Sequence, residues 1–291
     1  MNTVVSYPDR GVGGNNNYRG NCSPLLIEDL LKFFQPKKVF DPMVGGGTTI
    51  DVCKKLGIEH MCLDLNPTYG GFDALSEEIP VASDFVFWHP PYHQIIQYSG
   101  NAWGTQPDSR DLSRCSNYGE FIKKINVIQA KLLTSLKKGG HIAILVGDVK
   151  KNGVLYSIQK DMDWYGSPLY LIIKAQHNCW SDKQVYDGKL IRIVHEYCLV
   201  FKRDDCYVLP VKTVKQISCD LRNSEKISWR DVVLSALMKL GGKASLEMLY
   251  EEIQGHKKTK TNDHWKDKVR QVVQSYKDFV NIARGEYSIA A

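Results

Sequence analysis

The chain has 291 residues, of which 43% are apolar and 24% are charged. This length provides for roughly two domains with buried cores, and the composition excludes a disordered chain, a fibre and a disulfide-rich mini-protein. No apolar run approaches the ~18 residues of a membrane-spanning helix, and residues 1–20 are polar rather than signal-like. We therefore expect a soluble protein with no recognisable targeting segment.

The eight cysteines indicate the redox environment of the protein, and the distribution of charge indicates the class of partner. No pair of cysteines has CxxC spacing, and several lie inside hydrophobic runs such as 60–63 and 197–199. We therefore expect reduced thiols of a cytoplasmic protein, with no disulfide framework and no metal site. The net charge is +6, and residues 211–291 carry fifteen Lys and Arg against ten Asp and Glu. A basic C-terminal part suits a polyanionic partner, although a charged, solvated surface explains the excess equally well.

The first two thirds of the chain alternate short β-rich segments with helical ones. In chain order, we expect strands at 38–40, 60–63, 84–88, 141–146, 169–174 and 195–202, and helices at 48–56 and 118–138. This alternation predicts an α/β domain over residues 1–205, with a doubly wound, mostly parallel, Rossmann-like sheet covered by helices.

Helical periodicity returns after a connector at about 204–226. Ser228, with Asp231 three residues later, is typical of a capped helix, which we expect to end at Gly241-Gly242. A second helix is expected from Ser245, and a hairpin over 279–289. A third helix over 262–276 would bury Trp265, Val269, Val272, Val273 and Tyr276. Three helices and a hairpin predict a winged-helix domain over residues 226–291.

Several polar side chains of this domain suit contact with DNA. Lys266, Arg270, Gln274 and Lys277 fall opposite the apolar face of the third helix, and Arg284 lies in the turn of the hairpin. A recognition helix presents such groups to phosphates and base edges. The alternative is a solvated helix face in a protein-interaction module. The segment resembles the HARE-type helix-turn-helix domains that are attached to restriction and modification proteins.

A glycine-rich turn joins the strand at 38–40 to the helix at 48–56. Residues 41–49 read Asp-Pro-Met-Val-Gly-Gly-Gly-Thr-Thr, and glycines here let the backbone turn sharply and let a ligand approach. No Lys follows the glycines, which argues against a phosphate-binding P-loop. Asp64 ends the next strand, where a carboxylate can accept two hydrogen bonds from a ribose diol. The sequence therefore predicts a cofactor at the mouth of this helix.

Two motifs carry a resemblance to a known family. Asp-Pro-x-x-Gly-x-Gly-Thr-Thr resembles the S-adenosylmethionine motif of amino-group DNA methyltransferases, and His89-Pro90-Pro91-Tyr92 resembles their [DNS]-Pro-Pro-Tyr catalytic motif. The resemblance covers about residues 18–202. It implies S-adenosyl-L-methionine as the cofactor and cofactor-binding roles for Asp41, Pro42, Gly45, Gly47, Thr48, Thr49 and Asp64.

Two weaker likenesses extend the implied cofactor site. Residues 19–24 look like motif X of the family, which implies that Asn21 and Ser23 hold the methionine end of the cofactor. Asp73 looks like the acidic residue that meets the adenine.

The catalytic motif suits transfer to an exocyclic amine, which is a poor nucleophile because its lone pair is delocalised into the ring. Acceptors for both N–H bonds favour the reactive amine, and here they would be a ring nitrogen of His89 and the carbonyl of Pro90. The two prolines stiffen the loop, and Tyr92 offers a face to an extruded base. Since only a neutral imidazole can accept, we expect turnover to fall as the pH drops through roughly 6.5.

Histidine in the first position departs from the family pattern. Asp or Asn there suggests adenine as the target and Ser suggests cytosine, whereas His suggests neither, and the alternative is a histidine that only packs in the turn. The polar segment 94–117, which contains Tyr98, Trp103 and Arg110, is expected to form a lid over the extruded base or else a surface excursion.

These features together predict a two-domain enzyme that binds double-stranded DNA and methylates adenine N6, with cytosine N4 as the nearest alternative. A methyltransferase for RNA or protein amides is a further candidate. So is a non-catalytic DNA-binding regulator with a decayed enzyme fold. A restriction endonuclease is a candidate partner of an enzyme of this class.

Overall fold

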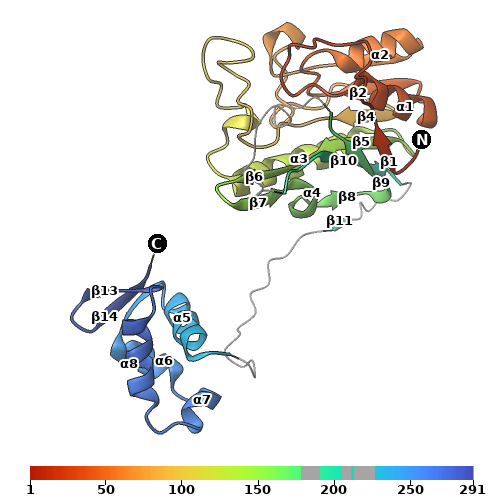
Figure 1. Ribbon diagram of the computed structural model, residues 1–291. Coiled ribbons are helices and arrows are strands. Elements are labelled where there is room, and N and C mark those ends of the chain that lie inside the picture. The colour runs from red at the N-terminus through yellow and green to blue at the C-terminus, as the bar shows by residue number, and fades with distance from the viewer. Residues whose placement is uncertain (178–190, 205–210, 213–226, 291) are drawn as a thin grey trace. The chain divides into compact units, whose positions relative to one another are not determined.

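The chain divides into two compact units in a computed structural model, Met1–Val214 and Lys215–Ala291 (Figure 1). The structure describes residues 1–177, 191–204, 211–212 and 227–290. The connector expected at 204–226 therefore lies almost entirely outside the described residues.

A seven-stranded sheet forms the centre of the first unit, in the order β1-β9-β10-β5-β4-β2-β3. Its strands are β1 (Val4–Ser6), β2 (Lys38–Asp41), β3 (Glu59–Cys62), β4 (Phe85–Trp88), β5 (His141–Val146), β9 (Ser167–Ala175) and β10 (His195–Lys202). All neighbouring strands pair in parallel except β10, which is antiparallel to both β5 and β9. The predicted α/β fold with a mostly parallel sheet is confirmed.

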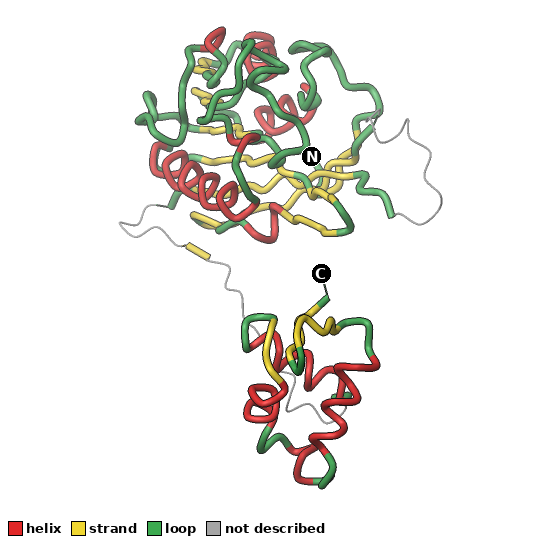
Figure 2. The backbone as a smooth tube through the Cα atoms, turned by 90° about the vertical axis from the view of Figure 1, so that its left-hand side faces the viewer, coloured by secondary structure: helices red, strands yellow, loops and turns green. Residues whose placement is uncertain are grey.

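Helices cover both faces of this sheet (Figure 1, Figure 2). Alternate residues of β5 point to opposite faces. Ile142 and Ile144 belong to the core formed with α3 (Tyr118–Ser135), whereas Ala143 and Leu145 belong to the core formed with α1 (Pro24–Phe34) and α2 (Thr48–Leu56). Burial on both faces explains why these strands read as continuous apolar runs.

Local sequence sets the ends of these helices. The Ser23 side chain accepts a hydrogen bond from the backbone N–H of Leu25 and so caps α1, and Asn117 caps α3 by accepting from Glu120. The helix expected to reach Lys138 ends at Ser135, because Leu136 adopts an extended conformation and is fully buried in the core. The chain then turns at Gly139, whose φ is +75°.

Four further strands and several short helices complete the elements of the first unit. The hairpin of β6 (Asp148–Lys151) and β7 (Val154–Ser157) follows β5, and β8 (Trp164–Tyr165) pairs with β11 (Val211–Lys212). The short helices are α4 (Ile158–Asp161), η1 (Pro67–Tyr69) and η2 (Leu112–Arg114). None of these elements, nor β1, was expected from the sequence.

The second unit contains four helices and a three-stranded sheet among its described residues. They are α5 (Trp229–Lys239), α6 (Leu246–Ile253), α7 (Lys257–Lys260), α8 (Trp265–Ser275), β12 (Lys243–Ser245), β13 (Phe279–Ala283) and β14 (Glu286–Ile289), with β14 between β12 and β13. The expected capping box of Ser228 and Asp231 is present at the start of α5. Tyr276, expected to be buried, is 46% exposed, because α8 ends at Ser275 and Tyr276 has an extended backbone.

The described residues offer neither a membrane-spanning helix nor a cluster of metal ligands. No helix among them is long and apolar enough to cross a membrane. Within the same residues, no group of three or more His, Cys, Asp or Glu side chains is placed to hold a metal ion.

Candidate active site

The glycine-rich turn and the His-Pro-Pro-Tyr motif leave neighbouring parallel strands at the same edge of the sheet. β2 ends at Asp41 and β4 ends at Trp88, and β2 pairs with β3 on one side and with β4 on the other. The chain thus reverses its direction of winding between β2 and β4. In open α/β sheets, ligands bind in the crevice at this switch point, outside the carboxyl ends of the strands.

Asp41 holds the two ends of the glycine-rich turn together. One of its carboxylate oxygens accepts from the backbone N–H of Met43 at 2.9 Å, and the other accepts from the Thr49 hydroxyl at 2.5 Å. Gly45 and Gly47 have φ of +52° and +81°, which side chains disfavour. Burial raises the pKa of Asp41 to about 7, although these two hydrogen bonds oppose the shift.

Asp64 connects the end of β3 to the same turn. Its oxygens accept from the backbone N–H groups of Gly45 at 2.9 Å and Asn66 at 2.8 Å. Burial raises the pKa of this carboxyl group, which is only 8% exposed. A carboxylate has about four acceptor positions, so Asp64 retains lone pairs for hydroxyl groups of a ligand.

The N-terminal strap, residues 10–18, covers the glycine-rich turn. The Asn15 N–H donates to the carbonyl of Gly46 at 2.7 Å, and the Gly14 N–H donates to the Asp51 carboxylate at 2.8 Å. The Tyr18 ring lies so close to the turn that a Cβ on Gly45 would stand 2.9 Å from a ring carbon of Tyr18. The strap was not expected from the sequence, because its glycines and asparagines show neither helical nor strand periodicity.

A first cavity joins the two motifs. The predicted cofactor residues that line it are Asn21, Asp41, Pro42, Gly45, Thr48, Thr49, Asp64 and Asp73. His89 and Pro91 of the catalytic motif line the same cavity. Gly47 shapes the turn without lining the cavity.

Ser23, Asp73 and Asn21, which were also predicted to hold the cofactor, make hydrogen bonds elsewhere in the protein. Ser23 caps α1 and lines a different cavity. The Asp73 carboxylate accepts from Leu75 N–H and the Ser76 hydroxyl, so it organises its own turn. The Asn21 side-chain amide donates to the carbonyl of Asn15 in the strap at 2.7 Å.

The catalytic motif belongs to a buried polar chain. His89 Nε2 is 3.0 Å from the Tyr92 hydroxyl, which donates to Glu196 Oε1 at 2.7 Å. Glu196 Oε2 accepts from Lys174 Nζ at 2.6 Å. Glu196 and Lys174 are directly paired across β10 and β9, and they are 7% and 8% exposed. Neither was predicted, although a charged residue inside an otherwise apolar strand is a recognisable sign of a buried partner.

Burial lowers the pKa of His89 to about 4, against the attraction of the Glu196 charge. The imidazole is therefore neutral well below pH 6.5. We therefore expect the loss of turnover at a lower pH than 6.5, because desolvation disfavours the charged ring.

Tyr92 is less open than a stacking platform requires. Its hydroxyl is bound to Glu196, and its ring packs so closely on Gly147 that a Cβ there would stand 2.7 Å from the ring. The ring also meets His89 edge to face, with centroids 5.5 Å apart.

A second cavity adjoins the first. It is lined by Pro90, Tyr92, Glu196 and Lys174, and it shares Tyr18, Gly20, Asn21, His89 and Tyr98 with the first cavity. Arg19, an exposed residue, contributes a positive charge to its lining. His89 therefore stands at the boundary between the two cavities.

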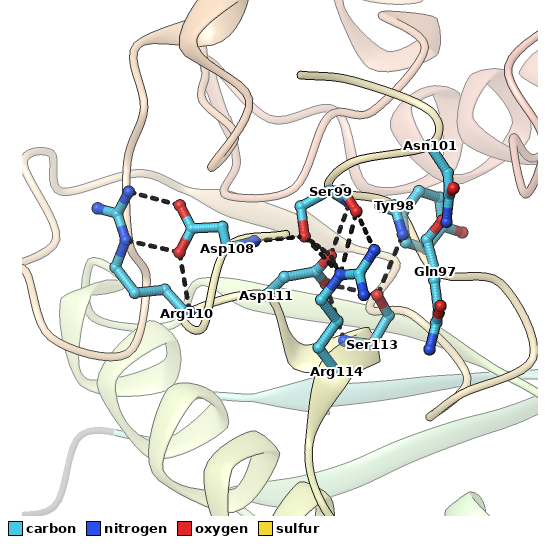
Figure 3. Close-up of polar contacts among 9 residues, drawn as sticks. All are labelled: Gln97, Tyr98, Ser99, Asn101, Asp108, Arg110, Asp111, Ser113 and Arg114. Carbon is cyan, nitrogen blue, oxygen red and sulfur yellow. Dashed lines mark hydrogen bonds and ion pairs between the residues drawn. The ribbon is translucent and has the colours of Figure 1, made fainter. Parts of the chain in front are cut away.

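The segment expected to act as a lid forms a hydrogen-bonded wall (Figure 3). The Asp111 carboxylate accepts four hydrogen bonds, from the backbone N–H and the hydroxyl of both Ser99 and Ser113. Arg114 also donates to the Ser99 carbonyl. The segment lines the first cavity with Tyr98, Trp103, Arg110, Asp111 and Leu112. Only Tyr98 and residues 95–96 reach the second cavity, so the segment covers mainly the glycine-rich side.

All five residues expected to contact DNA are exposed in the second unit. Lys266 lies 5.5 Å from the ring centroid of Tyr250 and 5.6 Å from that of Trp265. Arg270 is 3.5 Å from Asp267, with both side chains more than half exposed. The described residues of α8 thus present a cationic, partly aromatic surface.

No protein-family model and no curated protein sequence matches the chain significantly. Solved structures similar to it include TrmN from Thermus thermophilus, at 14% identity over 64% of this chain and 50% of TrmN, with a TM-score of 0.38. A candidate DNA modification methylase, also from Thermus thermophilus and complexed with S-adenosyl-L-methionine, matches at 20% identity over 47% of this chain and 56% of its own, with a TM-score of 0.30. The N-methyltransferase NodS from Bradyrhizobium japonicum, in complex with S-adenosyl-L-homocysteine, matches at 9% identity over 61% of this chain and 83% of its own, with a TM-score of 0.36.

The chain thus spans about half the length of the first two structures. All three TM-scores lie below 0.5, so we infer the function of the site from the residues of the chain itself.

Proposed function

We propose that the chain is an S-adenosyl-L-methionine-dependent DNA methyltransferase that modifies the exocyclic N6 of adenine. The observation that carries this proposal is the first cavity, which the glycine-rich turn of residues 41–49 lines together with His89 and Pro91. A cofactor site and an amine-binding motif in one cavity are what direct transfer between two bound molecules requires.

The lining of the first cavity fits this cofactor. Asp64 retains acceptor positions for a ribose diol, and the turn at Gly45 and Gly46 exposes backbone where side chains would collide with Tyr18. Phe72, Ala74, Leu112 and Ile128 supply apolar walls suited to an adenine ring. Asn21, which donates to the strap and lines the same cavity, would meet the amino-acid end. When bound, S-adenosyl-L-methionine supplies an electrophilic methyl group on its sulfonium.

The residues at the boundary of the cavities would activate the amine. A ring nitrogen of His89 and the carbonyl of Pro90 accept its two N–H bonds, which favours the pyramidal form with an available lone pair. The low pKa of His89 keeps that nitrogen unprotonated at neutral pH. Buried acceptors of fixed orientation also need no rearrangement during the reaction.

An extruded base is the substrate that the second cavity suits. A base inside a duplex cannot reach His89, so it must leave the stack at a cost of a few kcal/mol. Tyr18 and Tyr98 line both cavities and offer aromatic surface, and Arg19 offers a charge for a phosphate.

We infer that the second unit is a winged helix that binds duplex DNA. Three helices of eight residues or more and a β-hairpin support this, with Lys266, Arg270, Gln274 and Lys277 exposed on or just after α8 and Arg284 exposed in the hairpin. Such side chains hold a duplex mainly through its phosphates.

The direct test is methyl transfer from S-adenosyl-L-methionine labelled with tritium in the methyl group, followed by nucleoside analysis of the product. We expect label in the N6-methyl-2′-deoxyadenosine released from duplex DNA. Label in cytosine N4, RNA or protein would replace the proposed substrate. Asp64→Asn should abolish most transfer, whereas Glu59→Gln, at the exposed first residue of the preceding strand β3, should retain it.

A further inference from the structure

The buried polar chain beside the active site contains an ion pair that no step described so far uses. Lys174 and Glu196 lie on adjacent antiparallel strands in direct register, with Nζ and Oε2 2.6 Å apart. The chain continues through the Tyr92 hydroxyl to His89 Nε2, at 2.7 Å and 3.0 Å. Burying an ion pair is costly, so its presence in the core of β9 and β10 needs an explanation.

The chemistry of these groups fixes the direction of every hydrogen bond in the chain. A lysine ammonium only donates, and an ionised carboxylate only accepts. Burial alone would raise the pKa of Glu196, but the charge of Lys174 and the hydrogen bonds outweigh it and lower the pKa. Tyr92 must therefore donate its single O–H to Glu196. Its oxygen can then only accept from His89, which places the imidazole proton on Nε2.

The opposite ring nitrogen is consequently an acceptor. Nδ1 of a neutral imidazole protonated at Nε2 carries a lone pair. No described residue forms a hydrogen bond with His89 Nδ1, and the His89 ring lines both cavities.

We propose that Lys174, Glu196 and Tyr92 are positioning residues that lock His89 in the Nε2–H tautomer, so that Nδ1 is the nitrogen that receives an amine N–H of the substrate. This inference rests on the proposed function for the identity of the substrate, but the tautomer itself is a property of the free protein. It also assigns Tyr92 a role in orienting His89 rather than in stacking on the base. Histidines that bind metals are fixed in one tautomer in a similar way, because the ring nitrogen that does not bind the metal donates its N–H to a neighbouring acceptor.

Replacing Glu196 by glutamine should reverse the chain. The amide carbonyl of the glutamine must face the Lys174 ammonium, because the amide NH₂ cannot accept. The NH₂ then donates to the Tyr92 oxygen, and the Tyr92 O–H turns towards His89 Nε2. Nε2 becomes the acceptor, and the proton moves to Nδ1. Glu196→Gln keeps the size and shape of the side chain, yet it should convert His89 Nδ1, the nitrogen that meets the substrate, from acceptor to donor.

The experiment is nitrogen NMR of the full chain, labelled with ¹⁵N at histidine and recorded at pH 7 without substrate. The His89 signals are assigned by their loss in His89→Ala. We expect the Nε2–H tautomer in the wild type, the Nδ1–H tautomer in Glu196→Gln and a mixture in Tyr92→Phe. Tyr197→Phe is the matched control, because Tyr197 contacts His195 at 2.9 Å on the same strand as Glu196. It should leave His89 unchanged.

An Nδ1–H tautomer in the wild type, or an unchanged His89 tautomer in both Glu196→Gln and Tyr92→Phe, would overturn the proposal. Tyr92→Phe serves as the second variant if Glu196→Gln does not fold.

Kinetic measurements test the same proposal independently. Glu196→Gln should lower kcat at least tenfold and leave the affinity for S-adenosyl-L-methionine within twofold. Loss of cofactor affinity in parallel with kcat would contradict a positioning role. A wild type with the expected tautomer but no methyl transfer would refute the proposed function and leave the hydrogen-bond chain established.

Discussion

Tyr18 stacks on Tyr98, with ring centroids 5.8 Å apart and ring planes 16° apart. The pair joins the N-terminal strap to the wall formed by residues 94–117, and both rings line both cavities. Two segments that are some 80 residues apart in sequence therefore close over the site through one aromatic contact.

Removing this contact should weaken ligand binding on both sides of His89. A stacked aromatic pair contributes about 0.5–1.5 kcal/mol beyond its buried area, so Tyr98→Ala should raise both the Kd for the cofactor and the KM for DNA roughly threefold to tenfold. Tyr98→Phe keeps the stack and is the control. An effect of Tyr98→Ala on kcat alone would show that the pair does not hold the ligands.

Asp111 should control the order of the wall segment. Its carboxylate accepts four hydrogen bonds and is 5% exposed, so Asp111→Ala leaves buried N–H and O–H donors unpaired, at a cost of about 1–3 kcal/mol each. We expect a lower melting temperature and faster proteolysis within residues 94–117. Asp108→Ala is the matched control in the same loop. It removes an ion pair to Arg110, which is 51% exposed, and should cost less than about 1 kcal/mol. Equal losses for the two variants would refute the central role of Asp111.

Much of the site was predictable from the sequence because its motifs are local. The turn of residues 41–49 and the motif of residues 89–92 each lie within one strand-to-loop junction, and the residue types there are dictated by backbone geometry and chemistry. The bounds of the helix at 48–56 and the strands at 141–146 and 195–202 were likewise correct, because each is a continuous apolar or amphipathic run.

The remaining features depend on contacts between distant residues. Glu196 meets Tyr92 across 104 positions, and the strap has no periodic pattern, so neither follows from local sequence. One omission was avoidable: Asn152-Gly153, with φ of +52° and +79°, joins β6 to β7, and an Asn-Gly pair between β-rich segments is a strong hairpin signal.

His89 should make the stability of the protein depend on pH. Its folded-state pKa of about 4 lies below the ordinary value near 6.5, so the unfolded chain binds the proton more readily. This stability is fully present above pH 6.5 and is lost as the pH drops, and the loss reaches roughly 3 kcal/mol by pH 4. His89→Gln should flatten this part of the curve of unfolding free energy against pH, measured by urea titration. An unchanged slope would mean that the ring is not held neutral.

The rate of methyl transfer should not follow the ordinary histidine titration. With saturating cofactor, we expect the His89-dependent rate to stay level from pH 8 to pH 5.5, since the imidazole remains neutral throughout. Single-turnover measurements isolate the chemical step from product release. A fall centred near pH 6.5 would show that the ring is more solvated than its surroundings indicate.

Substitutions on α8 should weaken DNA binding without changing the chemistry. Lys266→Ala or Arg270→Ala removes one phosphate contact, so each should lower the slope of log K against log salt by about one. Single-turnover rates at saturating DNA should stay unchanged. Lys243→Ala, an exposed lysine on β12, is the control. A salt slope that is the same in all three variants would remove α8 from the DNA interface.

The most direct measurement uses a bisubstrate ligand in which the N6 of adenosine is linked to the position of the sulfonium in the cofactor. If the glycine-rich turn and His89 serve one cavity, this ligand should bind at least about 100-fold more tightly than S-adenosyl-L-homocysteine, because its second half binds at high effective concentration. His89→Ala should erase the gain but keep the affinity for S-adenosyl-L-homocysteine, and Asp64→Asn should reduce both. A bisubstrate that binds no better than S-adenosyl-L-homocysteine, or a gain that survives His89→Ala, would contradict a shared site for cofactor and base.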